Sequence, residues 1–262
     1  MKKTLLSLAM AAILGVITTS ASAFPTFTVS EIVVPGANAN TFTTDRITGA
    51  YKEITVSTGG TGFSSSAIGD FTSYLLTGSP SPAQQLSDSS PPLTPNLYRM
   101  YVRFLSAGTV SGNLFTATSG SAELYLDPSS DTKFSNAGGA NFISGTAYAT
   151  ANSGSGEDIL LGASTSSFGT GIVGAAPSAF ELFFTNFGLT PNGKSYFTSP
   201  TPFYAKLRAT GGTSGFAGGN FPFTSTGDFS VSASVVPEPA SMALMGLALA
   251  GLGVIRRRKA AK

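Results

Sequence analysis

An all-β fold, closest to an antiparallel β-sandwich, is predicted for the central part of this 262-residue chain. Three observations lead to that prediction. Nothing between the two ends has the 3.6-residue periodicity of a long amphipathic helix. Short runs of β-branched and aromatic residues recur instead, separated by clusters of Gly, Ser, Asn or Pro. Two of these runs alternate between apolar and polar residues, as strands with one buried face do.

Eight segments are expected to form strands. In chain order they are residues 27–34, 47–56, 97–105, 114–118, 121–126, 180–185, 203–209 and 228–236. The alternation in residues 98–104 puts Tyr101 opposite the apolar face, and the alternation in 122–126 does the same for Tyr125. We therefore expect both tyrosines to face solvent. The 20 Phe supply the large core side chains in the absence of Trp. A parallel β-helix is the rival fold, but no regular repeat supports it.

Two segments are expected to lie outside the sheet. Residues 78–95 contain five prolines among polar residues, which excludes a central strand and indicates a long extended loop or an internal linker. A linker there would divide two small β-domains. Residues 24–76 offer few strands of their own, so one domain is the preferred interpretation. Residues 211–220 are rich in Gly and are expected to form a flexible loop.

The composition excludes several kinds of active site. The chain contains no Cys, no His and no Trp. It therefore has no Ser-His-Asp triad, no Cys/His zinc site and no imidazole general base. Carboxylates, Lys and Tyr are the remaining groups for acid–base chemistry. We expect a protein that is not an enzyme and that needs no cofactor.

The charge of the chain is concentrated at its ends. The whole sequence has a net charge of +2, but residues 24–236 contain eight Lys and Arg against twelve Asp and Glu, so that region has a net charge of −4. It also contains 32 Ser and 28 Thr, more than a quarter of its residues. A mildly acidic region without a basic patch is not expected to bind nucleic acid. Its many hydroxyl groups suit contact with hydrated polysaccharide.

The N-terminus has the three parts of a secretory signal peptide. Lys2 and Lys3 form a positive region, and residues 5–17 form a short apolar region. Ala21 and Ala23 have the small side chains that signal peptidase requires, so the mature chain is expected to begin at Phe24 after export by the Sec route. An uncleaved membrane anchor is the alternative, but the apolar region is short for a membrane span.

The C-terminus also has three parts. Pro237, Glu238 and Pro239 come first and are expected to be extended, because these prolines prevent a helix from continuing upstream. Residues 240–255 are apolar or small apart from one Ser and are expected to form a single transmembrane helix. Residues 256–262 form a basic tail that should stay on the cytoplasmic side. Its basic cluster consists of Arg256, Arg257, Arg258 and Lys259.

The Pro-Glu-Pro segment, the short apolar helix and the arginine cluster resemble the PEP-CTERM sorting signal of exported bacterial proteins. The resemblance implies processing by an exosortase, a membrane-embedded transpeptidase-like enzyme, after a transient stay in the inner membrane. The mature part would then reach the cell surface or the extracellular matrix. A tail anchor that is never processed is the alternative. The chain accordingly divides into a signal peptide (1–23), an extracellular β domain (24–236) and a sorting signal (237–262).

The central region carries a second resemblance. Residues 44–51, 157–161 and 197–204 are similar to blocks of flocculation-associated PEP-CTERM proteins, which floc-forming bacteria export alongside exopolysaccharide. The resemblance implies a role in cell aggregation with extracellular polysaccharide as partner, and it brings no catalytic residues with it. Two other functions stay open. One is a secreted polysaccharide hydrolase that uses carboxylates, and the other is a passive surface glycoprotein without a specific ligand.

Two acidic pairs are candidates for chemistry. Glu157 with Asp158, or Asp127 with Asp131, could hydrolyse glycosidic bonds without His. Both pairs lie beside turn residues, where solvated acids are common, so catalysis is not expected. Residues 127–131 also carry oxygen ligands, but they lack the spacing and the turn glycine of an EF-hand loop. A turn capped by Asp is expected there, without a metal ion.

Tyr101 and Tyr125 are the candidates for direct sugar contact. A tyrosine ring on a sheet surface can stack on the apolar face of a sugar, while Ser and Thr bind its hydroxyls. Tyrosines on neighbouring strands are also common in β-proteins that bind no sugar. The many Ser and Thr could in addition accept O-linked glycans.

Overall fold

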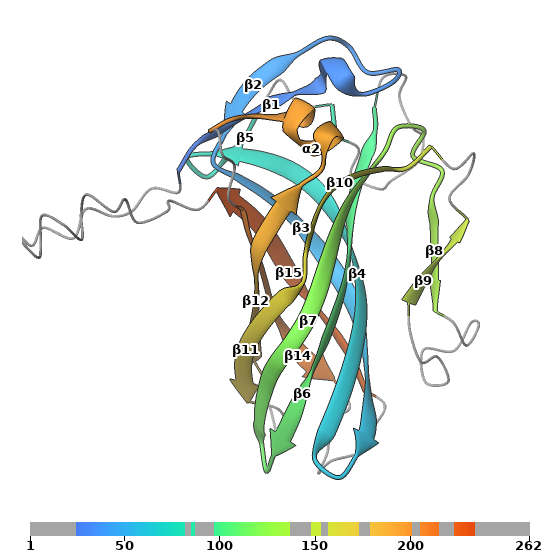
Figure 1. Ribbon diagram of the computed structural model, residues 1–262, viewed down its shortest axis with the longest axis vertical. Helices are drawn as coiled ribbons and strands as arrows, with labels where there is room; N and C mark the ends of the chain where they lie inside the picture. Colours follow the sequence, from blue (N-terminus) through green and yellow to red (C-terminus); the bar gives the residue numbers. More distant parts are fainter. Residues whose placement is uncertain are drawn as a thin grey trace, which may run out of the picture.

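The computed structural model describes residues 25–81, 85–86, 97–136, 148–152, 157–172, 179–200, 205–214 and 223–233. In this part of the chain most residues lie in antiparallel strands (Figure 1), so the all-β prediction is confirmed. No helix among these residues has the length and apolar character needed to span a membrane. The transmembrane helix expected at 240–255 lies outside the described residues, as do the signal peptide and the basic tail.

One large sheet accounts for most of the structure. Its strands are β3 (Arg46–Gly59), β4 (Gly62–Leu76), β6 (Arg99–Ser111), β7 (Leu114–Asp127), β10 (Ile159–Ser164), β11 (Ser166–Ile172), β12 (Ala179–Leu189), β14 (Ala205–Ser214) and β15 (Phe223–Ala233), with the short β5 (Ser79–Pro80) paired to the end of β4. The other elements are β1 (Phe27–Ser30), the 3-10 helix η1 (Glu31–Val33), β2 (Thr41–Thr44), β8 (Lys133–Asn136), β9 (Tyr148–Asn152), the helix α2 (Pro191–Tyr196) and β13 (Phe197–Ser199).

The large sheet closes on itself, which corrects the expectation of a β-sandwich. β12 pairs with β11 on one side and with β14 on the other, and β15 pairs with β3, so the strand order returns to its start. β10 and β11 are consecutive in the sequence and share one place in the sheet. Each of them pairs with β7 on one side and with β12 on the other. Alternation along a strand specifies that one face is buried. It does not specify whether that face packs on a second sheet or on the far side of its own sheet.

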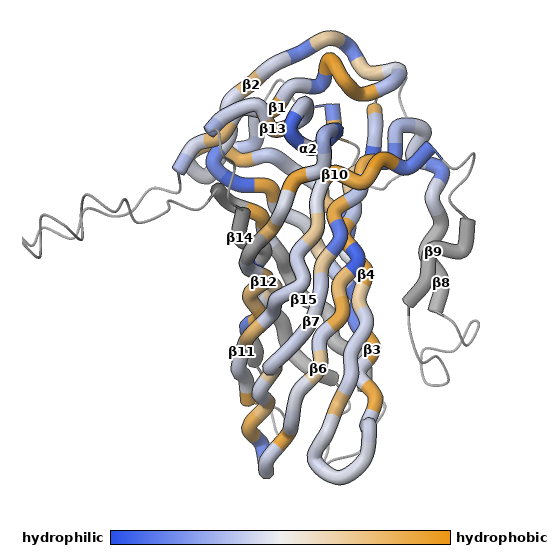
Figure 2. The backbone as a smooth tube through the Cα atoms, viewed as in Figure 1, coloured by the Kyte–Doolittle hydropathy of each residue, from blue (hydrophilic) through white to orange (hydrophobic). Residues whose placement is uncertain are grey.

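Side chains on the inner face form an aromatic core. Phe63 stacks on Phe115 near the β3–β4 and β6–β7 turns, with ring centroids 4.4 Å apart. Phe104 contacts both Tyr51 and Phe184 at centroid separations of 5.3 Å. All five rings are at most 4% exposed, which confirms a core role for these Phe residues. Figure 2 shows hydrophobic stretches of the strands separated by stretches of near-neutral hydropathy.

A polar layer interrupts the aromatic core. Ser65 of β4 and Ser106 of β6 are register partners, and their hydroxyl oxygens are 2.6 Å apart. Glu53 lies on the buried face of the adjacent strand β3 and is only 2% exposed. Its burial raises the pKa of the carboxyl group to about 7, against the opposing effect of a hydrogen bond to Ser65. Among the described residues, nothing donates a hydrogen bond to the Glu53 Oε1 atom.

A small cap covers one end of the closed sheet (Figure 1). It consists of the three-stranded sheet β13–β1–β2 together with η1 and α2. The ring of Phe27 on β1 meets that of Phe197 on β13 edge-on at 5.9 Å. α2 begins after Thr190, whose hydroxyl accepts a hydrogen bond from the backbone N–H of Gly193 at 3.1 Å, as N-cap residues do.

A buried carboxylate ties this cap to the large sheet. Glu31 of η1 is 0% exposed, and its two carboxylate oxygens accept four hydrogen bonds. The donors are the side chains of Tyr98, Asn40 and Gln85 and the backbone N–H of Gln85. The hydroxyl of Tyr196 on α2 lies between those of Tyr98 and Tyr74 and is hydrogen-bonded to both. This network joins residues that are far apart in the sequence.

Most of the expected strands are present, with different ends. Residues 114–118 and 121–126 form the single strand β7, because Ser119 and Gly120 stay paired with β6. Residues 211–214, expected in a loop, belong to β14 and pair with β15 as far as Ser214. Residues 31–33 form η1 instead of continuing the first strand. Within residues 78–95, the described part adds only the two-residue strand β5 at the end of β4.

Candidate functional site

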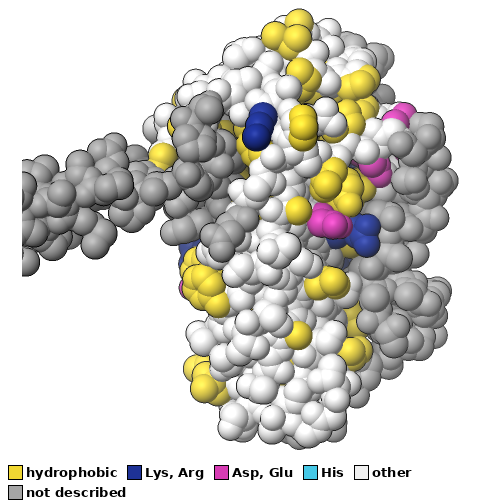
Figure 3. All heavy atoms as spheres, in the orientation of Figure 1, with side chains coloured by type: hydrophobic (Ala, Val, Ile, Leu, Met, Phe, Trp, Pro, Cys, Tyr) yellow, Lys and Arg dark blue, Asp and Glu magenta, His cyan; other side chains and the backbone are white. Residues whose placement is uncertain are grey.

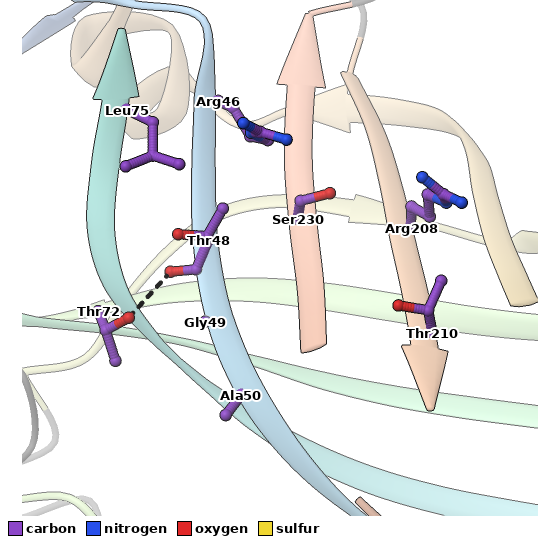
Figure 4. Close-up of a pocket in the computed structure, with 9 residues that line it drawn as sticks. All are labelled: Arg46, Thr48, Gly49, Ala50, Thr72, Leu75, Arg208, Thr210 and Ser230. Carbon is purple, nitrogen blue, oxygen red and sulfur yellow. Dashed lines mark hydrogen bonds between the residues drawn. The ribbon is translucent and has the colours of Figure 1, made fainter. Parts of the chain in front are cut away.

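A groove crosses the outer face of the large sheet over β4, β3, β15 and β14 (Figure 4). It encloses about 490 Å³, within the usual range for small-molecule sites. Its lining consists of Arg46, Thr48, Gly49, Ala50, Thr72, Leu75, Arg208, Thr210 and Ser230. We call this surface the arginine groove. It combines two guanidinium groups with four hydroxyl groups.

The register of the strands brings these side chains together. Thr48 of β3 is the partner of Ser230 of β15, and Ser230 is the partner of Arg208 of β14. Paired residues point to the same face, so the three form one row across the sheet. Arg46 and Thr210 lie two residues along their own strands, on the same face. Figure 4 shows Ser230 between the two arginines.

Arg46 stands at a corner that hydrogen bonds hold in place. The Thr44 hydroxyl donates to the backbone oxygens of Leu75 at 2.5 Å and of Arg46 at 3.1 Å. The carboxylate of Asp45 accepts a hydrogen bond from the backbone N–H of Thr77 at 2.6 Å. These contacts fasten the start of β3 to the end of β4. The half-buried Arg46 side chain therefore leaves the sheet at a defined position.

Arg208 is more accessible than Arg46. Its guanidinium group forms an ion pair with Glu181 of β12, and the two side chains are 53% and 37% exposed. An exposed pair of this kind contributes about 0–1 kcal/mol because water and salt screen it. The guanidinium group has five N–H donors, so it can bind a further acceptor while Glu181 stays close.

The described lining of the groove is polar but carries no side chain that commonly acts in acid–base catalysis. Its described lining contains no Asp, Glu, Lys or Tyr, so it offers no group that could exchange a proton near neutral pH. The guanidinium groups can donate hydrogen bonds, and the hydroxyl groups can both donate and accept them. On the face shown in Figure 3 most of the surface is neither hydrophobic nor charged, and coloured side chains occur in small, separate groups.

The two tyrosines expected to contact sugar lie elsewhere. Their rings stack at a centroid separation of 5.1 Å on the outer face of β6 and β7. The expectation that Tyr101 faces solvent is wrong, since it is 2% exposed and donates a hydrogen bond to Asp158 at 2.8 Å. Burial and the bond to that carboxylate raise the pKa of Tyr101. Tyr125 is half-buried and donates to Glu123 at 3.1 Å.

The turn expected at residues 127–131 is confirmed. Asp127 is fully buried, and its carboxylate accepts hydrogen bonds from the backbone N–H groups of Asp131 at 3.3 Å and Thr132 at 3.0 Å. The structure also brings Glu157 to this turn, so that carboxylate oxygens of Asp127, Asp131 and Glu157 lie within 4.8 Å of one another. Such a set of oxygen atoms could bind Ca²⁺. The Asp127 oxygens already accept backbone hydrogen bonds, which favours a structural role.

The acidic pair of Glu157 and Asp158 does not act as a unit, because the two side chains have different partners. Asp158 accepts hydrogen bonds from Tyr101 and from the Thr132 hydroxyl at 3.0 Å. Partial burial raises its pKa, and these hydrogen bonds act in the opposite direction. Its neighbour Glu157 is instead bonded to Ser129 in the exposed turn. The two adjacent carboxylates thus have separate partners, as expected for neighbours in an extended segment.

Comparison with known protein families identifies one feature of the chain. Residues 235–259 match the PEP-CTERM protein-sorting motif. The chain carries an exosortase sorting signal. The motif implies that the chain is exported and that it carries a membrane-anchored sorting signal at its C-terminus. No curated protein and no solved structure gives a significant match. The residues of the motif, including Pro237, Glu238 and Pro239, lie outside the described part of the structure.

The arginine groove was not among the sites expected from the sequence. Arg46 and Arg208 are separated by more than 160 positions, and only the pairing of β15 with both β3 and β14 places them on one surface. Neither Arg208 nor Ser230 stands out from the polar residues around it.

Proposed function

We propose that this PEP-CTERM protein acts outside the cell and promotes cell aggregation by joining the cell surface to matrix exopolysaccharide. The sorting motif supports export and exosortase processing. The Sec route, removal of residues 1–23 by signal peptidase, and a final location at the cell surface or in the matrix are parts of the same proposal. The protein itself carries out no catalytic step.

The observation that carries the proposal is the arginine groove. It is a polar groove of about 490 Å³ on the outer face of the sheet. Its four hydroxyl groups and two guanidinium groups match the hydroxyl and carboxylate groups of polysaccharides. A binding protein needs groups that complement those of its ligand. A hydrolase would also need a proton donor and a proton acceptor beside the bound chain.

Aggregation is tested by deleting the gene in the producing bacterium. We expect flocs to settle more slowly, with the same amount of polysaccharide produced, and we expect the full-length gene to restore settling. Unchanged settling in a strain that still makes its polysaccharide would contradict the proposal. The amount of polysaccharide is the necessary control, because a strain that makes less would also settle poorly.

A polysaccharide hydrolase remains the second candidate, and one observation favours it. Asp127, Asp131 and Glu157 bring three carboxylates together at a turn, where Asp131 is exposed, Glu157 is half-buried and Asp127 is buried. Paired carboxylates can cleave glycosidic bonds without His. Incubating the protein with the matrix glycan of its host and measuring chain length decides the matter. Shortened chains that depend on Glu157 would establish the hydrolase.

A further inference from the structure

We propose that the arginine groove binds a carboxylated polysaccharide, that is, a chain containing uronic-acid units, and that Arg46 and Arg208 contact its carboxylates. This inference rests on the proposed function and names the class of glycan for the same surface. A neutral glycan would use the hydroxyl groups of the groove but would offer no carboxylate to either guanidinium group.

The charge of the groove differs from that of the region around it. Residues 24–236 have a net charge of −4, whereas the described lining of the groove contains two Arg and no acid. A local positive surface on an acidic region selects for a ligand that carries negative groups at a defined place. Guanidinium groups are suited to carboxylates because two parallel N–H groups can contact both carboxylate oxygens.

The separation of the two arginines suits a chain that carries several carboxylates. β3 and β14 lie on opposite sides of β15, and Arg46 lies two residues along β3 from Thr48, which is in register with Arg208, so the two Cα atoms are about 12 Å apart. Two carboxylates on one chain can contact one guanidinium group each, and binding at the first raises the effective concentration at the second.

The floor between the arginines suits the remaining groups of a sugar. Ser230, Thr48 and Thr210 present hydroxyls that both donate and accept hydrogen bonds. Ala50 and Leu75 add small apolar surfaces for the C–H groups of a ring. The described lining has no aromatic ring for stacking, so binding must depend largely on charge and hydrogen bonds. Its affinity is therefore expected to fall as the salt concentration rises.

Glu181 sets the strength of this interaction. It is paired with Arg208 at the edge of the groove, and its carboxylate competes with an incoming uronate for the same guanidinium group. Removing that negative charge should strengthen binding of an acidic chain. The E181Q variant is therefore expected to bind more tightly than the wild type, a direction that general damage to the fold does not produce.

The test measures binding of fluorescently labelled oligogalacturonate to the full-length chain in mild detergent. The variants are R46Q, R208Q, the double variant, E181Q and the control K194Q, which removes one positive charge from exposed α2. We expect about a tenfold loss of affinity in the double variant, since two solvent-screened ion pairs with the ligand disappear. E181Q should bind severalfold more tightly and K194Q should be unchanged. Carboxyl-reduced oligomers of the same length, and monomeric galacturonate, should bind weakly.

Several outcomes would overturn the inference. They are equal binding of reduced and acidic oligomers, equal losses in K194Q and the double variant, or no binding of oligogalacturonate. Displacement by inorganic phosphate or by a short DNA strand as effectively as by oligogalacturonate would indicate a general anion site and would also overturn it. Binding without a settling defect on gene deletion would remove the aggregation role and leave the groove. A settling defect without oligogalacturonate binding would do the reverse.

Discussion

Two buried glutamates show how differently the same residue can be accommodated. Glu31 accepts four hydrogen bonds from three side chains and one backbone group, so its carboxylate is satisfied without contact with water. Glu53 is also buried and is hydrogen-bonded to Ser65, but no described residue donates to its Oε1 atom. A buried carboxylate with few donors favours its neutral form. The two residues therefore predict opposite effects of the same substitution.

The Glu53→Gln substitution should remove a pH-dependent loss of stability. Burial raises the pKa of Glu53 from 4.5 to about 7, so the folded protein binds one proton more than the unfolded chain between these values. The free energy of unfolding should therefore fall as the pH rises through this window, by about 3 kcal/mol in total. Urea unfolding of both proteins at pH values on either side of the window measures this difference. Parallel pH profiles would contradict the assignment.

The Glu31→Gln substitution should lower the free energy of unfolding by about 2–4 kcal/mol. An amide cannot accept at both of its ends, so its NH₂ group would face the donors of Gln85 or Tyr98 and leave buried groups unsatisfied. The matched control is Glu181→Gln, which changes an exposed residue and should stay within about 0.5 kcal/mol of the wild type. Similar unfolding midpoints for the two variants would show that the buried network contributes little.

At the scale of elements, α2 depends on a close approach between backbones. A Cβ atom on Gly193 would lie 1.8 Å from the backbone oxygen of Leu161 on β10, which no rotamer can relieve. Gly193→Ala should therefore move α2 away from β10 and destabilise the fold by about 1–3 kcal/mol. Gly188→Ala is the control, since the nearest atom to its new Cβ is 3.9 Å away. Thermal unfolding of both variants tests the contact, and equal midpoints would contradict it.

The sorting signal leads to a prediction about a different element. Replacing Pro237, Glu238 and Pro239 by alanine removes the segment that the exosortase is expected to recognise. We expect an unprocessed form that stays in the membrane fraction, because the apolar segment 240–255 would remain attached. Immunoblots of membrane and medium fractions measure this. Identical release of mutant and wild type would show that the motif is not needed for processing.

The elements that the sequence predicted share one property, a run of large apolar residues on the buried face. β6 alternates in this way, and its expected start is within two residues of the observed one, although the strand continues six residues past the expected end. β4 was missed because several of its inward positions carry Ser, Ala or Gly, as at Ser65, Ala67 and Gly69. Small inner side chains are needed where rings from other strands, such as Phe104, fill the interior. The sequence of one strand does not show which side chains of other strands fill the space next to it.

At the scale of the whole molecule, closure of the sheet determines which residues meet. The pairing of β15 with β3 joins segments from the two ends of the described chain and creates the surface with Arg46 and Arg208. Local sequence patterns identify strands, but they do not determine which strands are neighbours. The groove could therefore not be predicted, whereas the capped turn at Asp127 could, because its partners are within five residues.

Settling of the gene-deletion strain, complemented with the wild-type gene or with the R46Q/R208Q variant, tests the central claim most directly. The account predicts that the wild-type gene restores settling and that the double variant, exported in equal amount, does not. Settling of the deletion strain at the rate of the parent, with unchanged polysaccharide, would contradict the claim.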